Sequence, residues 1–327
     1  MNAVRETLSR RDRLAGGLIG LLLGDAFGVP YEFTLAAEVP EAQDIEFEPP
    51  AGFLRSHAGT PPGTWSDDGA QALCLLASLL HNDRLDVEDF GRRLVNWNDH
   101  GYMTPDGRVF DVGVQTSRAL QVIRSGGPAV TAGGASDSDN GNGSLLRVLP
   151  LALWHVGSDE QLVRDAFLQS LPTHGHVRSQ VCCAIYVLWA RRLLGGQEVE
   201  SAWLDAVRAT RVLLADSPEA IEQLEFHIRP DGDATGRGTG YVVDALRSAR
   251  QVQPAGDYEA IVHAAIRLGN DTDTTACIAG GIAEIRFGLA AIPARWREGL
   301  QGLDVVEPLL DQLLASRTSG GPGDQST

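Results

Sequence analysis

Apolar residues recur every three or four positions in one segment after another, and this spacing constrains the fold more than any other feature of the chain. Strict alternation of apolar and polar residues, which would indicate a half-buried strand, is hard to find over a useful length. We therefore expect an all-α protein with about a dozen helices. The clearest helical periods lie at 69–82, 86–98, 144–156, 159–171, 176–194, 200–214, 256–268 and 274–288.

No fixed repeat and no long linker divides the 327 residues, so one compact multi-helix bundle is the simplest organisation. We place this helical domain at residues 1–316. The last residues, 317–327 (RTSGGPGDQST), are of low complexity, and we expect them to be disordered.

The chain is acidic, with 43 Asp and Glu residues against 27 Lys and Arg residues. Such a balance repels a nucleic-acid backbone or an anionic membrane surface unless basic residues cluster locally, and the sequence has only short pairs such as Arg191-Arg192. We therefore expect neither nucleic acid nor a membrane as a partner. The same charge suits cation binding wherever carboxylates converge.

The four cysteines, Cys74, Cys182, Cys183 and Cys277, all lie inside apolar segments. They show neither a CxxC pair nor the Cys and His spacing of a zinc site. We interpret them as buried free thiols, which indicates a reducing compartment and predicts a cytoplasmic location.

The apolar run at 14–24 (LAGGLIGLLLG) follows the basic segment RRDR and allows two interpretations. A basic segment followed by an apolar run is the layout of a secretory signal. However, the run carries glycines at four-residue intervals, which let another backbone approach closely, and no convincing cleavage site follows it. We favour a buried helix and, because the run is short, do not expect it to span a bilayer.

Four connecting stretches are rich in Gly, Asp, Asn, Ser and Thr, at 59–69, 131–144, 229–240 and 269–275. Long polar loops on a rigid scaffold commonly carry binding residues, with plain turn chemistry as the alternative. Two of these stretches place carboxylates directly before an apolar helix. These are TWSDD at 64–68 and GNDTDTT at 269–275.

Two explanations fit this crowding of oxygen at helix starts. One is N-capping, because Ser, Thr and Asp satisfy the free N–H groups of a first turn. The other is a hard divalent cation, which takes oxygen ligands and would relieve the repulsion between the carboxylates. Spacing alone leaves both open. The oxygen donors, enough for a site of two ions, are Ser66, Asp67, Asp68, Asp271, Asp273 and Thr274.

A series of strings along the chain resembles, in order, those of the ADP-ribosylglycohydrolase family, all-helical hydrolases typified by the dinitrogenase-reductase-activating enzyme. The strings are GLLLGDAFGVPYEF (20–33), TWSDDGAQAL (64–73), FDVGVQTSRAL (110–120), GNGSLLRVLPLAL (141–153), THGHVRSQ (173–180), GTGYVVDAL (238–246) and GNDTDTTACIAGGIAE (269–284). Each string alone is weak, but the series extends from about residue 12 to about residue 290, which is most of the chain.

The resemblance implies an orthogonal helical bundle of the family's type with two Mg²⁺ or Mn²⁺ ions. The family's T-D-D string matches 66–68 and its D-x-D-T string matches 271–274, which implies that these oxygens hold the ions. Glu32 matches the glutamate beside the metals, with a role in gating or base catalysis. Residues matched to the ADP-ribose cleft are Asn142, Gly143, Ser144 and His174, and more loosely Tyr241 as a ring for adenine or ribose.

The implied activity is removal of ADP-ribose from a modified protein side chain, most often arginine in this family, by water attacking the ribose C1″. Positive charge develops on the sugar, so carboxylates must dominate the field around that carbon. Glu32, Asp67 and Asp273 are the candidates for base or proton donor. The expected partner is an ADP-ribosylated protein or small molecule, and the expected state is a monomer.

Two positions depart from the family pattern. Ser66 replaces the usual Thr and keeps a hydroxyl, whereas Gly69 replaces a Thr and loses one. Gly69 motivates one alternative, hydrolysis of a small ADP-ribose or nucleoside-type substrate. Another alternative is a non-catalytic ADP-ribose-binding or structural relative, against which the retained aspartates and Glu32 argue. Arg147 and Asp111 could each contact substrate or form a structural ion pair.

Overall fold

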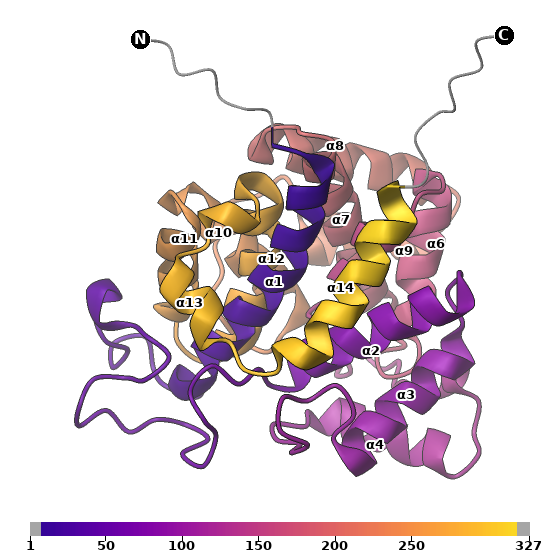
Figure 1. Cartoon of the computed structure of the whole chain (residues 1–327). Helices are drawn as coiled ribbons and strands as arrows, with labels where there is room; N and C mark the ends of the chain where they lie inside the picture. The colour runs from indigo at the N-terminus through magenta and orange to yellow at the C-terminus, as the bar shows by residue number, and fades with distance from the viewer. Residues whose placement is uncertain (1–7, 319–327) are drawn as a thin grey trace, which may run out of the picture.

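The computed structural model describes residues 8–318, whose path Figure 1 traces. Within this part every regular element is helical, and the strand-like contacts are two isolated bridges, Gly134 with His174 and Gly141 with Tyr241. The all-α prediction is confirmed. The α-helices are α1 (Arg10–Gly28), α2 (Asp67–Asn82), α3 (Val87–His100), α4 (Val114–Arg124), α5 (Leu149–Trp154), α6 (Asp159–Ser170), α7 (Val177–Leu194), α8 (Val199–Leu213), α9 (Pro218–Glu222), α10 (Val242–Val252), α11 (Tyr258–Ile266), α12 (Thr272–Phe287), α13 (Ala294–Gly299) and α14 (Leu303–Thr318).

Each predicted helical period overlaps an observed helix, and local chemistry explains where the ends of α2 and α5 differ. The helix predicted from 69 begins two residues earlier, because the Ser66 hydroxyl caps α2 by accepting a hydrogen bond from the N–H of Asp68. The helix observed within the predicted period 144–156, α5, is shorter than that period. Turns closed by the carbonyl of Asn142 occupy the first residues of that period, and α5 then begins at Leu149, with Pro150 in its first turn.

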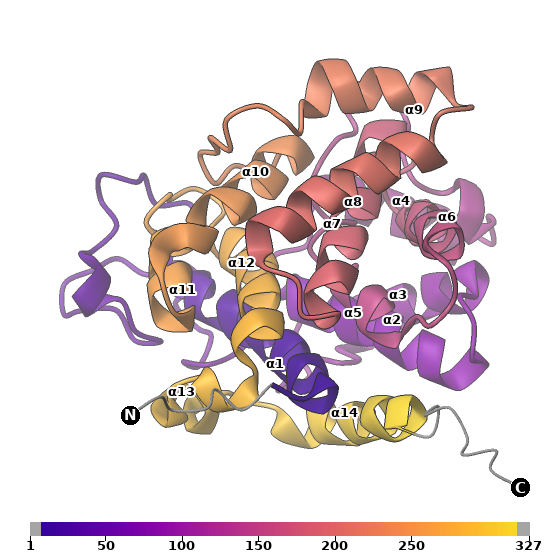
Figure 2. The same cartoon turned by 90° about the horizontal axis from the view of Figure 1, so that it is seen from above.

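The centre of the molecule is the contact between α1 and α12. Figures 1 and 2 show α12 in the interior, behind α1 and between α11 and α7, and α12 packs against all three. A Cβ atom at Gly24 would lie 2.1 Å from the carbonyl oxygen of Ala276, and one at Gly28 would lie 2.2 Å from the Cα of Asp273. Two backbones approach this closely only where side chains are missing. The end of α1 therefore fixes the start of α12.

The buried-helix interpretation of 14–24 is confirmed, since those residues lie inside the protein. The expectation that this segment is too short to span a bilayer is wrong. With its 3₁₀ extension η1 (Val29–Tyr31), the helical segment Arg10–Tyr31 is the one among the described residues that is long and apolar enough to cross a membrane, although its apolar window is fully buried. The expectation came from the shorter run alone, without the residues that continue the helix.

The boundary between a helical domain and a disordered tail stays a prediction. α14 continues to Thr318, so the first two residues of the predicted tail are helical. The rest of it, 319–327, lies outside the described residues.

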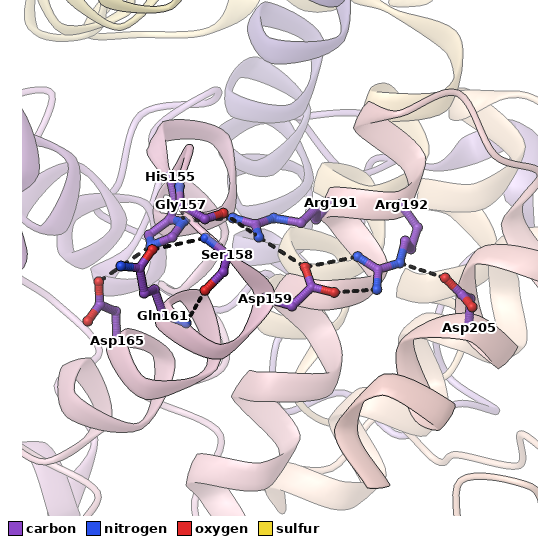
Figure 3. A network of polar contacts seen from close by, with 9 residues as sticks. All are labelled: His155, Gly157, Ser158, Asp159, Gln161, Asp165, Arg191, Arg192 and Asp205. Atoms are coloured by element: carbon purple, nitrogen blue, oxygen red, sulfur yellow. Dashed lines mark hydrogen bonds and ion pairs between the residues drawn. The ribbon is translucent and has the colours of Figure 1, made fainter. Parts of the chain in front are cut away.

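The last turn of α7 is held by a polar network, drawn in Figure 3. Arg192 contacts Asp159 at 2.5 Å and Asp205 at 2.7 Å. The first contact joins α7 to the start of α6, and the second joins α7 to α8. Arg191 contacts Asp159 at 3.0 Å and the Nδ1 atom of His155 at 2.6 Å. The basic pair seen in the sequence is therefore occupied by internal partners, at the end of α7 remote from the loop that carries His174.

Candidate active site

A cleft with a volume of about 270 Å³ opens where the first turns of α2 and α12 face four loops. The loops precede α4, α5, α7 and α10, and the segment after α1 closes one side. Polar groups dominate its walls. The lining residues are Glu32, Asp67, Asp68, Asp111, Gly113, Val114, Gln115, Thr116, Gly141, Asn142, Gly143, Leu146, His174, Gly240, Asp271 and Thr274.

Carboxyl groups converge on the floor of this cleft. Ligand oxygens of Glu32, Asp271 and Asp273 lie within 4.8 Å of one another. Both carboxylate oxygens of Asp273 and the Oδ2 atom of Asp68 are buried without a hydrogen-bond partner among the described residues. Buried polar atoms are normally satisfied, so oxygens orphaned in this way fit a hard cation held between α2 and α12.

The protonation behaviour of the cluster supports this fit. Burial, and then the neighbouring Asp111 and Asp271, raise the pKa of Glu32 to about 10. Burial also raises the pKa values of Asp67, Asp68 and Asp273 well above the usual aspartate range, with repulsion from nearby carboxylates next. Each of these groups gains from a positive charge placed among them, and a divalent cation supplies two.

Asp25, an acidic residue of α1, holds the backbone at the first turn of α2. Its carboxylate accepts hydrogen bonds from the N–H of Ser66 at 2.9 Å and from the N–H of Gly69 at 2.7 Å. Sequence reasoning gave Asp25 no role. The available signal was its position as the one acidic residue within the apolar run 14–31, where a charge needs a dedicated partner.

Gly69 is explained by packing. A Cβ atom there would lie 2.8 Å from Leu22 Cδ2 and 2.8 Å from the ring of Trp65. The side chains of Leu22 and Trp65 therefore fill the space that a threonine would need. The glycine at this position therefore reflects how Leu22 of α1 and Trp65 pack against α2.

Glu32 is paired with a residue that the sequence did not single out. Its Oε2 atom lies 2.6 Å from Nε2 of His57, and the two side chains are 4% and 16% exposed. The His57 ring lies 4.9 Å from the ring of Phe110 and 5.9 Å from that of Phe33. Burial lowers the pKa of His57, so the imidazole beside Glu32 is neutral near pH 7. Glu32, Phe33 and His57 belong to the largely irregular segment between η1 and α2, which lies at one edge of the molecule (Figure 1), whereas Phe110 precedes α4.

The opposite wall is built from the loop 141–144 and His174. Asn142 donates from Nδ2 to Asp271 Oδ2 at 2.8 Å and from its backbone to the carbonyl of Gly240 at 3.0 Å. A Cβ atom at Gly143 would lie 2.6 Å from Cε1 of His174, so only glycine allows this contact. Burial lowers the pKa of His174 to about 3, which keeps the ring neutral.

Two residues predicted for the cleft do not line it. Ser144 is fully buried behind the wall, where its hydroxyl faces Cys183 Sγ at 3.5 Å. The Tyr241 hydroxyl accepts a hydrogen bond from Arg178 at 3.3 Å, and Tyr241 is 38% exposed without lining the cleft. Both follow residues that do line it, Gly143 and Gly240, so sequence proximity alone was a poor guide to direction.

The structure separates the two residues that the sequence left open. Asp111 lines the cleft beside Glu32, with its backbone in the left-handed region at φ 54°, and burial raises its pKa to about 6. Arg147 is fully buried and does not line the cleft. Neither forms an ion pair within residues 8–318, so the ion-pair alternative fails for both.

Comparisons with known proteins agree on one family. A profile described as ADP-ribosylglycohydrolase matches residues 6–322. The chain is 30% identical over 305 residues to the ADP-ribosylarginine hydrolase Tri1 of Serratia proteamaculans, covering 92% of this chain and 79% of that protein. It is 28% identical over 314 residues to the ADP-ribosyl-[dinitrogen reductase] glycohydrolase of Rhodospirillum rubrum, covering 94% and 97%. A solved structure described as an ADP-ribosylglycohydrolase-related protein complex matches with a TM-score of 0.72 at 27% identity, covering 95% and 99%.

Proposed function

Since the chain belongs to the ADP-ribosylglycohydrolase family and is an ADP-ribosyl hydrolase, we propose that it removes ADP-ribose from modified arginine side chains of proteins with the help of two Mg²⁺ or Mn²⁺ ions. The observation that carries the proposal is the convergence of buried, unpartnered carboxylates at the floor of the cleft. The relatives' names support protein-bound ADP-ribose as the substrate.

The ions would be held by oxygens from the first turns of two helices. Serine and threonine hydroxyls complete a set of aspartates that offers more ligands than one small cation needs. Bound there, the ions would orient vicinal ribose hydroxyls and acidify water. The proposed ligands are Ser66, Asp67, Asp68, Asp271, Asp273 and Thr274.

The carboxylates also stabilise the sugar as it becomes positively charged. Among the candidate bases, Asp273 lies behind the cleft wall and Asp67 already accepts a hydrogen bond from Gln71 at 2.6 Å. Glu32 faces the cleft beside His57, and a cation bound next to it would lower its raised pKa, so that an ionised carboxylate becomes available. We therefore assign Glu32 the role of proton acceptor from the attacking water.

The wall formed by Asn142 and His174 is proposed to hold the ADP-ribose. Both side chains are neutral, so they contribute hydrogen bonds and contact surface. The glycines at 141, 143 and 240 leave peptide groups open to close approach by the pyrophosphate. Binding the pyrophosphate through peptide groups needs few Lys or Arg side chains, which suits an acidic chain.

The surroundings of Glu32 support arginine as the acceptor side chain. A guanidinium group is planar and positively charged, and it binds carboxylates and stacks on rings. Here Asp111 and Glu32 lie beside the rings of His57 and Phe110. A serine acceptor would use neither the charge nor the rings.

Release of ADP-ribose from defined substrates tests the proposal. The purified chain is incubated with ADP-ribosyl-arginine peptide, ADP-ribosyl-serine peptide and free ADP-ribose derivatives, each with Mg²⁺ or Mn²⁺ and with EDTA. We expect metal-dependent release that is fastest from arginine. Equal release in EDTA would contradict the metal site, and turnover of small nucleotides alone would favour the small-substrate alternative. Release from no substrate, in any metal, would sink the proposal.

We also propose that the protein works as a cytoplasmic monomer. The four cysteines are buried free thiols, which supports a reducing environment. Light scattering on the purified chain and fractionation of the host cells test the two statements separately.

A further inference from the structure

Arg147 carries a positive charge into the interior, and no carboxylate of residues 8–318 forms an ion pair with it. Its side chain is fully buried beside the cleft wall. It donates to Gln71 Oε1 at 2.8 Å, to Gln169 Oε1 at 3.3 Å and to the Gln169 carbonyl at 2.9 Å, and it lies 5.1 Å from the centre of the Phe90 ring. A buried guanidinium satisfied by neutral groups is expensive, so a gain elsewhere is expected to offset it.

The charge fixes which way the Gln71 amide points. A guanidinium group only donates hydrogen bonds, so Gln71 must turn its oxygen toward Arg147. Its NH₂ group then faces the other way and donates to Asp67 Oδ2 at 2.6 Å. With the amide flipped, two donors would meet at Arg147 and two acceptors would meet at Asp67. Arg147 thus sets the donor that Asp67 receives.

A second arm reaches the opposite wall of the cleft. Gln169 also turns its oxygen toward Arg147, and its NH₂ group donates to the carbonyl of Ser144 at 3.2 Å. Ser144 ends the loop whose residues Asn142 and Gly143 line the cleft. One guanidinium group therefore orients two amides, one behind the carboxylates of α2 and one behind the loop that faces them.

We propose that Arg147 is a positioning residue that fixes the Asp67 carboxylate through Gln71 and the 142–144 loop through Gln169. This rests on the proposed function in one respect, because Asp67 is taken there as a cation ligand. Partners that orient a ligand from outside the ligand set change metal affinity by about 10- to 100-fold when removed. Arg147 and Gln71 act in series, so their effects on cation binding should not add.

Calorimetric titration of the full chain with Mn²⁺ tests the inference. We expect Gln71→Met to weaken Mn²⁺ binding by about 10- to 100-fold. Arg147→Lys should weaken binding too, because lysine keeps the charge but loses the fork that reaches both amides. The double variant that combines Gln71→Met with Arg147→Lys should bind Mn²⁺ as tightly as the single variant with the lower affinity, because both changes interrupt the same chain of contacts. Circular dichroism confirms that each variant is folded.

The chain supplies a matched control in Gln253. It is 2% exposed, accepts from Arg286 at 2.9 Å through Oε1, and donates to two backbone carbonyls at 3.1 Å, so the same Arg–Gln pair ends on backbone in place of an aspartate. Gln253→Met should leave Mn²⁺ affinity within about twofold of wild type, since no ligand depends on it. An equal loss in Gln253→Met would reduce Gln71 to a general packing role and overturn the inference.

The remaining outcomes separate the two proposals. If wild type and Gln71→Met bind Mn²⁺ equally well, the positioning role is overturned and the proposed function is unaffected. Additive losses in the double variant overturn action in series. Wild type that binds no Mn²⁺ overturns the proposed function, and this inference with it.

Discussion

The two ends of α12 each bury a carboxyl group that has no hydrogen-bond partner among the described residues, yet their surroundings differ. At the start of the helix, Asp273 lies behind the wall of a cleft open to solvent, next to Glu32 and Asp271, which line that cleft. Near the far end, Glu284 is equally buried, packed against Gly20 of α1. Burial alone raises the pKa of Glu284 to about 9, so it keeps its proton at neutral pH.

The comparison shows that burial without a partner does not mark a site. A single buried acid avoids the cost of a buried charge by staying protonated, as Glu284 does. Several acids that share one cleft leave many oxygens unsatisfied even when protonated, and a cation can reach them from solvent. Convergence and access, added to burial, distinguish Asp273 from Glu284.

The largest expected effect is on activity, from Asp273→Asn. The change keeps the volume of the side chain and removes its negative charge. We expect the rate of ADP-ribose release to fall by at least about 100-fold, because losing even an outer partner of a metal site costs up to that much. Glu284→Gln is the matched control at the other end of the helix and should stay within about twofold of wild type. Similar losses in both variants, measured as kcat/KM, would erase the contrast between the two ends.

Gly28→Ala should damage the start of α12 through the backbone. The new Cβ atom would lie 2.2 Å from Cα and 2.3 Å from N of Asp273, so the first turn must move. Overpacking of this kind costs about 1–3 kcal/mol. We expect a lower unfolding temperature and weaker Mn²⁺ binding together. Gly59→Ala, where no atom lies within 4 Å of the new Cβ, should change neither.

Glu284 should make stability fall as pH rises. Its pKa is about 9 in the folded chain against an ordinary value of 4.5, so between these values the folded state holds a proton that the unfolded state has lost. Stability from this group is complete below about pH 4.5 and is lost through pH 9, by up to about 1.4 kcal/mol per pH unit. Urea unfolding at pH 5, 7 and 9 should show that the free energy of unfolding of Glu284→Gln increases relative to that of wild type as pH rises. Parallel pH profiles would indicate that Glu284 is solvated.

The smallest expected effect is that of Ser66→Ala, which separates capping from metal binding at α2. The Ser66 hydroxyl accepts a hydrogen bond from Asp68 N–H at 3.3 Å, and losing a cap costs about 1 kcal/mol. If the hydroxyl is also a ligand, Mn²⁺ affinity falls as well, as the proposed ligand set requires. A loss of stability with unchanged affinity would remove Ser66 from that set.

Much of the site was predictable because its chemistry is written in short strings. Asp67 and Asp68 precede one apolar helix and Asp271 and Asp273 another, and each pair was recognisable from local sequence. Ser144 and Tyr241 show the limit of such reasoning. Each adjoins a residue that lines the cleft, but side-chain direction depends on the turn, and theirs lead away from it.

The sequence by itself determined the all-helical class, most helix positions, the family and the aspartates of the cleft, because helical periodicity and oxygen-rich turns are local properties. Tertiary structure decided what lies between distant segments. It pairs Glu32 with His57, fills the space beside Gly69 with Leu22 and Trp65, and joins Asn142 to Asp271 across 129 residues. These contacts depend on how whole helices pack, and no local spacing encodes that. The orientation of Asp67 by Arg147, through Gln71, belongs to the same class.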